Sequence, residues 1–233
     1  MLVRSQRRGW AGCTPRAGHV PGARTLLGGA IATGMLFLLI ACSTPEVTLA
    51  QGAREYTPSD YERVFARWTR SEDLVTLRAL DNILTVTATF ESWDFRWAYS
   101  VRYARDYQLS EKQTQAMIDA ALEDSRHSHQ FFVALYGAQR KYSDLSTPQS
   151  AWTVRLVDDR GNETAPEAIA PIPKPGPVER TYFPYASVWR KVFRIRFPVS
   201  TSSGPSIAPD ARQIALRFTG PLGVEDLHWS ITR

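Results

Sequence analysis

Alternating apolar and polar positions predict about seven short strands along the chain. The first covers 83–91, where apolar side chains occupy the even positions from Leu84 to Phe90. The other predicted strands cover 129–137, 151–158, 167–172, 189–199, 212–220 and 225–232. Because short strands separated by turn-rich segments are typical of two-sheet proteins, the pattern predicts an antiparallel β-sandwich.

Apolar residues at helical spacing predict one helix before the strands and two helices between the first two strands. The early helix follows Thr57, a favourable N-cap, and its predicted buried face consists of Tyr61, Val64, Phe65 and Trp68. The third helix begins at Ser110, which forms a capping-box pattern with Gln113, and continues to Arg126. Its predicted inner face consists of Ala116, Met117, Ala120 and Ala121.

The segment 92–107, the second of the three helices, fits two patterns. Aromatic and apolar residues occupy the odd positions from Trp93 to Tyr103, as in a strand. A strand continuing from 83 to 103 would however exceed the usual length, and its inward parity would have to reverse near Ser92. Ser92 suits an N-cap, and a stripe through Trp93 and Trp97 suits a buried helical face. We predict a helix on the sandwich; a strand would instead create one continuous aromatic face.

An apolar run over Leu26–Ala41 follows several arginines. It is shorter than the roughly 20 residues that a membrane-spanning helix needs and is close to the h-region of a secretory signal. The run ends in Leu39-Ile40-Ala41-Cys42, which resembles the lipobox of bacterial lipoproteins. This resemblance implies that 1–41 is a signal peptide, that Cys42 carries a diacylglyceryl group, and that its new amine is acylated.

The same resemblance implies a place in the cell envelope. Ser43 after the cysteine favours the outer membrane by the enterobacterial sorting pattern, with the domain facing the periplasm. Two or three acyl chains on one residue make release from a bilayer negligible. The alternative is an uncleaved signal anchor with an ordinary buried Cys42. The long stretch before the apolar run, with Pro15 and Pro21, leads us to expect a translation start at Val20.

The predicted domain organisation is therefore a signal peptide at 1–41, a lipidated flexible tether at 42–56, and one α+β domain at 57–233. The strand sequences FFVALY, AWTVRLVD and VWRKVFRIRFP, with the helical pair before them, resemble the soluble domains of bacterial envelope lipoproteins with no assigned activity. That resemblance implies architecture and location, and no chemistry.

The net charge of +5 belongs to the leader. Residues 1–41 contain five arginines and no acidic residue. Residues 42–233 therefore contain 28 − 5 = 23 basic and 23 acidic side chains. This balance argues against a nucleic-acid partner, which requires a basic surface on the folded domain. Cys13 leaves with the leader and Cys42 is modified, so we expect burial, without disulfides, to stabilise the domain.

Few residues show the pattern of a catalytic or metal site. His127 and His129 form an H-x-H pair without a placed third ligand, which favours surface histidines over a metal site. The chain has no G-x-S-x-G, no glycine-rich phosphate loop and no CxxC, and we predict no cofactor. Four adjacent carboxylate pairs are interpreted as solubilising charges: Glu72-Asp73, Glu123-Asp124, Asp158-Asp159 and Glu225-Asp226.

Arginines at outward strand positions are the most distinctive predicted surface feature. Arg190, Arg194 and Arg196 share one face of 189–199, and Arg155 and Arg217 are outward on their own strands. If these strands are neighbours, the face would suit another envelope protein or an anionic glycan or lipid. The alternative is an exposed face with cross-strand pairs to Glu or Asp.

These observations favour a non-enzymatic lipoprotein, a binding or structural module at the periplasmic face of the outer membrane. An envelope hydrolase or a sugar-processing enzyme is the alternative. The two differ in one structural feature: an enzyme would have a pocket in which a histidine or a carboxylate pair converges with hydrogen-bond donors.

Overall fold

The computed structural model describes residues 45–76, 81–137 and 139–232. This part of the chain is α+β, with four α-helices and twelve strands that pair mostly antiparallel. The predicted signal peptide and the predicted lipidation site, Cys42, lie outside the described residues. None of the described helices is long and apolar enough to cross a membrane.

Two five-stranded sheets make up most of the domain. Across the first sheet the order is β2 (Thr69–Thr76), β3 (Asp81–Phe90), β4 (Ser128–Gly137), β8 (Lys191–Pro198) and β7 (Ala168–Ile172). Across the second it is β1 (Val47–Thr48), β12 (Gly223–Thr232), β11 (Gln213–Gly220), β5 (Thr153–Asp158) and β6 (Glu163–Thr164). Only β1 and β12 pair in parallel within these sheets of the described residues. A small hairpin of β9 (Ser200–Thr201) and β10 (Gly204–Pro205) stands apart.

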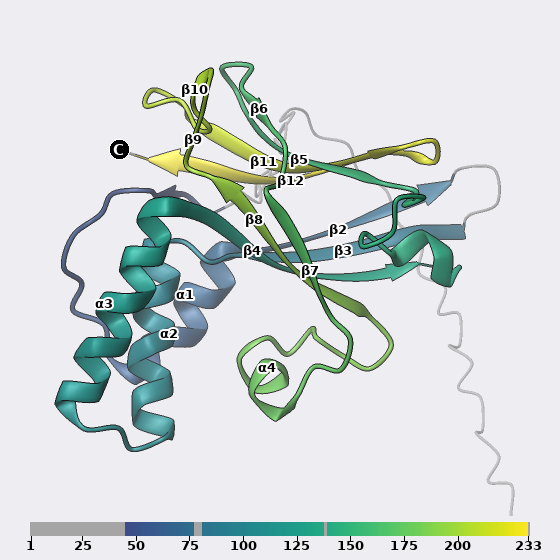
Figure 1. The fold of residues 1–233 in the computed structure, drawn as a ribbon. Coiled ribbons are helices and arrows are strands. Elements are labelled where there is room, and N and C mark those ends of the chain that lie inside the picture. Colours follow the sequence, from purple (N-terminus) through teal and green to yellow (C-terminus); the bar gives the residue numbers. More distant parts are fainter. Residues whose placement is uncertain (1–44, 77–80, 138, 233) are drawn as a thin grey trace, which may run out of the picture. The chain divides into compact units, whose positions relative to one another are not determined.

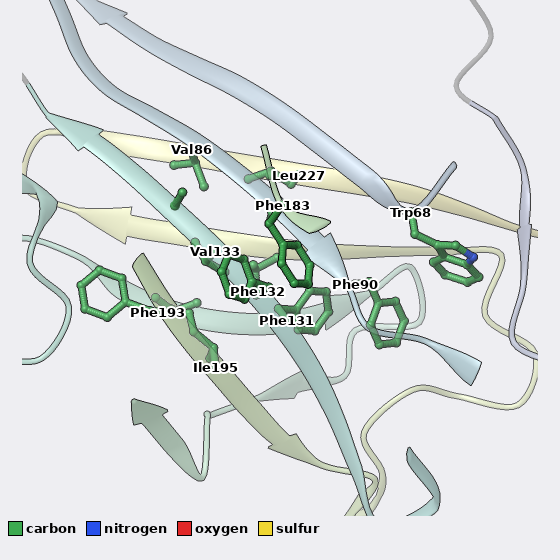
Figure 2. Packing of buried hydrophobic residues seen from close by; sticks show 14 of the residues in the cluster. Trp68, Val86, Phe90, Phe131, Phe132, Val133, Phe183, Phe193, Ile195 and Leu227 are labelled. Carbon is green, nitrogen blue, oxygen red and sulfur yellow. The ribbon is translucent and has the colours of Figure 1, made fainter. Parts of the chain in front are cut away.

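Large apolar side chains from both sheets form one buried core. Figure 1 shows the strands of the two sheets that contribute to it. The ring of Trp229 on β12 lies 6.4 Å from that of Phe90 on β3 and 5.6 Å from that of Phe131 on β4. The even positions of β3 from Leu84 to Phe90 are at most 2% exposed, which confirms the predicted inward face. Figure 2 shows Phe90, Phe131 and Trp68 gathered in this core.

The helices pack against the opposite face of the first sheet. Helix α1 (Tyr61–Trp68) buries the predicted face, with Tyr61, Val64 and Trp68 all buried. Helix α2 (Trp93–Asp106) begins where the side chain of Ser92 accepts a hydrogen bond from the Phe95 N–H, so the helix over 92–107 is confirmed. Helix α3 (Glu111–His127) has the predicted capping box at Ser110. Figure 1 shows α1, α2 and α3 lying together on this side.

The predicted inner face of helix α3 is only partly correct: Met117 and Ala121 are half-buried, but the fully buried side chains belong to other residues. Ile118 and Leu122 are buried against Trp93 of α2, whereas Ala116 and Ala120 are exposed. The prediction followed the run of alanines, but the longer aliphatic side chains reach the indole across the gap between the helices. Burial of larger apolar surface decides which face of the helix is inside.

All seven predicted strands are present, and β1, β2, β6, β9 and β10 were not predicted. Helix α4 (Pro177–Tyr182) was not predicted either, because the segment that leads into it, 171–177, is rich in proline. Pro177 occupies the first helical position, where a proline is tolerated. The strands that were missed are short or polar, so their apolar periodicity is weak.

Residues 45–56, predicted as part of a flexible tether, lie along the domain. Strand β1 pairs with β12 through Val47 and Ile231. Arg54 Nε donates to Asp94 Oδ1 at 2.6 Å, and Trp93 Nε1 donates to the Gly52 carbonyl at 2.7 Å. The tether prediction was therefore wrong for these residues, because their backbone and side chains find partners on α2 and on the edge of the second sheet.

Candidate functional site

The five arginines predicted to form one basic face lie in or next to two different sheets. Arg194 and Arg196 belong to β8 of the first sheet, and Arg190 lies in the bend directly before this strand. Arg155 on β5 and Arg217 on β11 are directly opposite each other in the second sheet. The expected single basic face does not form, because β8 is not a neighbour of β5 or β11.

The three arginines outside β8 form hydrogen bonds or ion pairs with other residues of the domain. Arg217 forms two hydrogen bonds with Asp226, its cross-strand neighbour on β12, at 2.9 and 2.7 Å. Arg155 Nε lies 3.4 Å from Glu163 Oε1, and Arg190 donates to Thr87 Oγ1 at 2.7 Å. On the second sheet the arrangement is thus one of cross-strand ion pairs.

Strand β8 presents its arginines toward the helices. In the antiparallel register Arg194 lies opposite Phe132 and Arg196 opposite Gln130 on β4. Phe132 stacks on Phe183, which follows α4, at 3.8 Å between ring centroids (Figure 2). The alternation correctly placed Arg194 and Arg196 on one face, but that face is half-buried under the helical layer.

Glu91 lies on the same side of the first sheet, between β3 and the start of α2. Its backbone N–H donates to the Gln130 carbonyl at 2.8 Å, and its carboxylate accepts a hydrogen bond from the Gln130 side chain. Arg194 Nη2 lies 3.5 Å from the other carboxylate oxygen. Glu91 is only 7% exposed, so this carboxylate is a buried charge held between β4 and β8.

The guanidinium of Arg96 connects α2 to α3 through hydrogen bonds that fix its position. Its Nε donates to the Glu91 carbonyl at 2.8 Å, and its Nη1 donates to the Ala121 carbonyl at 3.1 Å and to Asp124 Oδ2 at 2.6 Å. Asp124 also accepts from Arg196 Nη2 at 2.8 Å. Burial alone would raise the pKa of Asp124, but the hydrogen bonds and charges of the two arginines outweigh it and lower that pKa.

A pocket of about 140 Å³ lies among these residues. Its apolar wall consists of Phe95, Tyr99, Met117, Ala121 and Phe183. Its polar wall consists of Glu91, Arg96, Ser100 and Arg194, and we call this site the Arg96–Arg194 pocket. Burial raises the pKa of the Tyr99 phenol, and the Glu91 charge adds to the effect, so this hydroxyl stays protonated at neutral pH.

Three buried donors in the lining of this pocket have no hydrogen-bond partner among the described residues. They are Arg96 Nη2, Ser100 Oγ and Arg194 Nε. In the described part of the chain, one other buried side-chain polar atom has no hydrogen-bond partner, and this is Nε1 of Trp68. Because buried polar groups in proteins are nearly always paired, three unpaired donors around one pocket mark it as the candidate site.

The H-x-H pair is divided between two environments. His127 ends α3, is exposed, and has its Nε2 3.0 Å from Glu123 Oε1. His129 lies on β4 with its ring 5.9 Å from that of Phe90, and burial, with a smaller effect of the Arg96 charge, lowers its pKa to about 4. The expectation of a surface residue was wrong for His129. The described residues contain no group of three or more side chains able to hold a metal ion.

Several carboxylates interpreted as solubilising have structural contacts instead, among them Asp226, which pairs with Arg217. Asp158 accepts hydrogen bonds from the backbone of Arg160, Asn162 and Ala208 at 2.8 to 3.0 Å, and these bonds hold the turn after β5 to the segment before β11. Asp124 bridges two arginines, as described above. A sequence pattern of adjacent acidic residues does not distinguish these roles from solvent exposure.

Sequence reasoning missed Glu91, Arg96 and Ser100. Arg96 and Ser100 are four residues apart, so a helical reading already places them on one face of α2. Glu91 and Arg194 join them only through the β3–β4–β8 register, which the sequence does not specify. No protein-family model matches the chain, and comparisons with curated proteins and with solved structures found no match.

Proposed function

We propose that the protein is a lipid-anchored envelope lipoprotein whose domain is a non-enzymatic binding module facing the periplasm from the outer membrane. The observation that carries the binding role is the set of unpaired donors around the Arg96–Arg194 pocket. Ser100 Oγ has no hydrogen-bonded base among the described residues, and Glu91 is engaged by Gln130 and Arg194. Nucleophilic catalysis requires a nucleophile activated by a neighbouring base, so the arrangement favours binding.

The lipobox resemblance at Leu39–Cys42 supports the anchor, and the start of the fold adds a geometric consequence. Val47 pairs with β12, five residues after Cys42. Five extended residues span at most about 18 Å, so lipidation at Cys42 would hold the domain close to the bilayer surface. Such a short connection suits a module that works at the membrane face.

The packing of the sheets supports a sandwich as the core architecture of this module. Trp229 from the second sheet contacts Phe90 and Phe131 from the first, with large side chains of both sheets between them. The seven predicted strands form most of both sheets, and the eight-residue strand β2 and the two-residue strands β1 and β6 extend their edges.

Metabolic labelling with an alkyne fatty acid tests the anchor. The full-length chain, expressed in a bacterial host, should incorporate the label and fractionate with the outer membrane. The Cys42→Ala variant should lose the label and leave the outer-membrane fraction. A wild-type chain without label would contradict the lipoprotein proposal, and label retained by the variant would assign the lipid to another residue.

A further inference from the structure

We propose that the Arg96–Arg194 pocket binds small organic monoanions, namely carboxylates with a short apolar body, a ligand class that rests on the binding function proposed above. Donors and apolar side chains line opposite parts of the same pocket. That combination is typical of ligand sites in which a few polar groups fix the orientation of a mostly apolar molecule.

The unpaired donors match a carboxylate. Arg96 Nη2, Ser100 Oγ and Arg194 Nε each lack an acceptor among the described residues. A carboxylate has two oxygens with about four acceptor sites, enough for all three donors. Hydrogen bonds from an arginine to a carboxylate are charge-assisted and stronger than neutral ones. A neutral amide of the same shape would have fewer acceptor sites and no charge to offer.

The charges of the lining favour a single negative charge on the ligand. Two arginines and one glutamate line the pocket, and Asp124 pairs with Arg96 and with Arg196 beside it, so the cluster of three arginines and two carboxylates has a formal charge of 3 − 2 = +1. A monoanion neutralises this charge. A dianion would leave one uncompensated negative charge beside the buried carboxylate of Glu91, and an uncompensated buried charge is costly.

The donors are held in place before a ligand arrives. Arg96 makes three hydrogen bonds that fix its guanidinium against Glu91, Ala121 and Asp124. Arg194 lies over the Phe132 ring, with its guanidinium carbon 5.7 Å from the ring centroid. Because side chains that are already ordered lose little freedom on binding, this arrangement favours affinity for a small ligand.

The apolar wall and the volume limit the body of the ligand. Phe95, Tyr99 and Phe183 contribute aromatic rings, with centroids 5.8 to 6.4 Å apart. The pocket volume of about 140 Å³ is close to that of an engineered cavity of about 150 Å³ that holds benzene. Benzoate therefore combines the expected charge with about the largest body that fits.

Isothermal titration calorimetry on the full-length chain in detergent tests the ligand class with benzoate as the probe. Benzamide has nearly the same shape without the charge, benzylamine has the opposite charge, and inorganic phosphate is an anion without the apolar body. We expect one site for benzoate and at least tenfold weaker binding of the other three. Benzamide binding as tightly as benzoate would overturn the proposal.

Two variants locate the site. Arg194→Gln removes one charge and Ser100→Ala removes one hydroxyl, and each should weaken benzoate binding about fivefold or more. Arg217→Gln, in the other sheet, is the matched control and should leave the affinity unchanged. Unchanged affinity in Ser100→Ala, with native circular dichroism, would place benzoate elsewhere, even if Arg194→Gln failed to fold.

The outcomes separate the ligand class from the function on which it rests. Phosphate binding that depends on Ser100 and Arg194, without benzoate binding, would overturn the carboxylate class and retain a binding module. If no probe bound while Cys42 still carried the fatty-acid label, the proposal of a ligand site in the pocket would be wrong and the lipid-anchor proposal would stand. If benzoate bound to a chain that carried no label, the pocket proposal would stand and the lipoprotein proposal would be wrong.

Discussion

Replacing Ser100 with alanine should make the protein more stable. Ser100 lies within α2, is fully buried, and has no partner for its hydroxyl among the described residues. Leaving a buried polar group unpaired costs about 1–3 kcal/mol, so removing it recovers most of that amount. Alanine is also the better helix former, by roughly 0.5 kcal/mol. We expect Ser100→Ala to raise the free energy of unfolding by about 1–3 kcal/mol.

Ser125→Ala is the matched control. Ser125 lies in α3, and its hydroxyl donates to the Leu122 carbonyl at 2.7 Å. The helix-propensity gain is the same, but this variant loses a hydrogen bond worth about 1 kcal/mol. The helix-propensity gains cancel, so the two variants should differ by about 2–4 kcal/mol. For a chain of this size that difference corresponds to a separation in melting temperature of about 4–16 °C.

Urea unfolding followed by tryptophan fluorescence, with a thermal melt as a second probe, measures this difference on the full-length chain. Equal slopes in urea would show that only stability has changed. If Ser100→Ala were no more stable than wild type and no more stable than Ser125→Ala, the Ser100 hydroxyl would have a partner in solution. The pocket would then lack one of the unpaired donors that mark it as a site.

Three further predictions concern the rest of the domain. The pKa of His129 is about 4 in the folded chain, against 6.5 for the free group. Between these pH values the unfolded chain therefore binds more protons than the folded chain. The free energy of unfolding should fall by about 3 kcal/mol as the pH drops from 6.5 to 4. Urea midpoints measured against pH should show this loss in wild type and a flatter profile in His129→Gln. The Lys191 hydrogen bond lowers the pKa of Asp144 from 3.8 to about 2, so its contribution is present above pH 3.8 and is lost as the pH falls toward 2; Asp144→Asn should lack this acid-dependent part of the unfolding free energy. Trp229→Ala should cost about 3–5 kcal/mol in urea unfolding, because it leaves a cavity between the sheets, and a cost below 1 kcal/mol would contradict the core position of Trp229.

Local signals predicted much of the secondary structure. The N-caps at Ser92 and Ser110 and the even-position apolar face of β3 were all visible as short-range patterns, and the structure confirms them. Short-range patterns succeed here because capping and strand alternation depend on residues that are close in the sequence. The same signals settled 92–107 as a helix despite its strand-like alternation.

The site depended on long-range pairing, which those patterns do not specify. The outward face of β8 was predicted, but whether solvent or a helical layer covers it depends on the insertion between β3 and β4. Glu91 is a polar residue at the end of the first predicted strand, and it is only 7% exposed beneath that layer. A register that places Gln130 opposite Arg196 and beside Glu91 has to be known before the pocket can be recognised.

The ratio of the affinities for benzoate and benzamide, measured by calorimetry on the wild-type chain and on Arg194→Gln, tests the central claim most directly. Binding of a monoanion by the Arg96–Arg194 pocket predicts a ratio of at least ten in wild type that falls toward one in the variant. A ratio near one in wild type, or a ratio that the substitution leaves unchanged, would contradict this account.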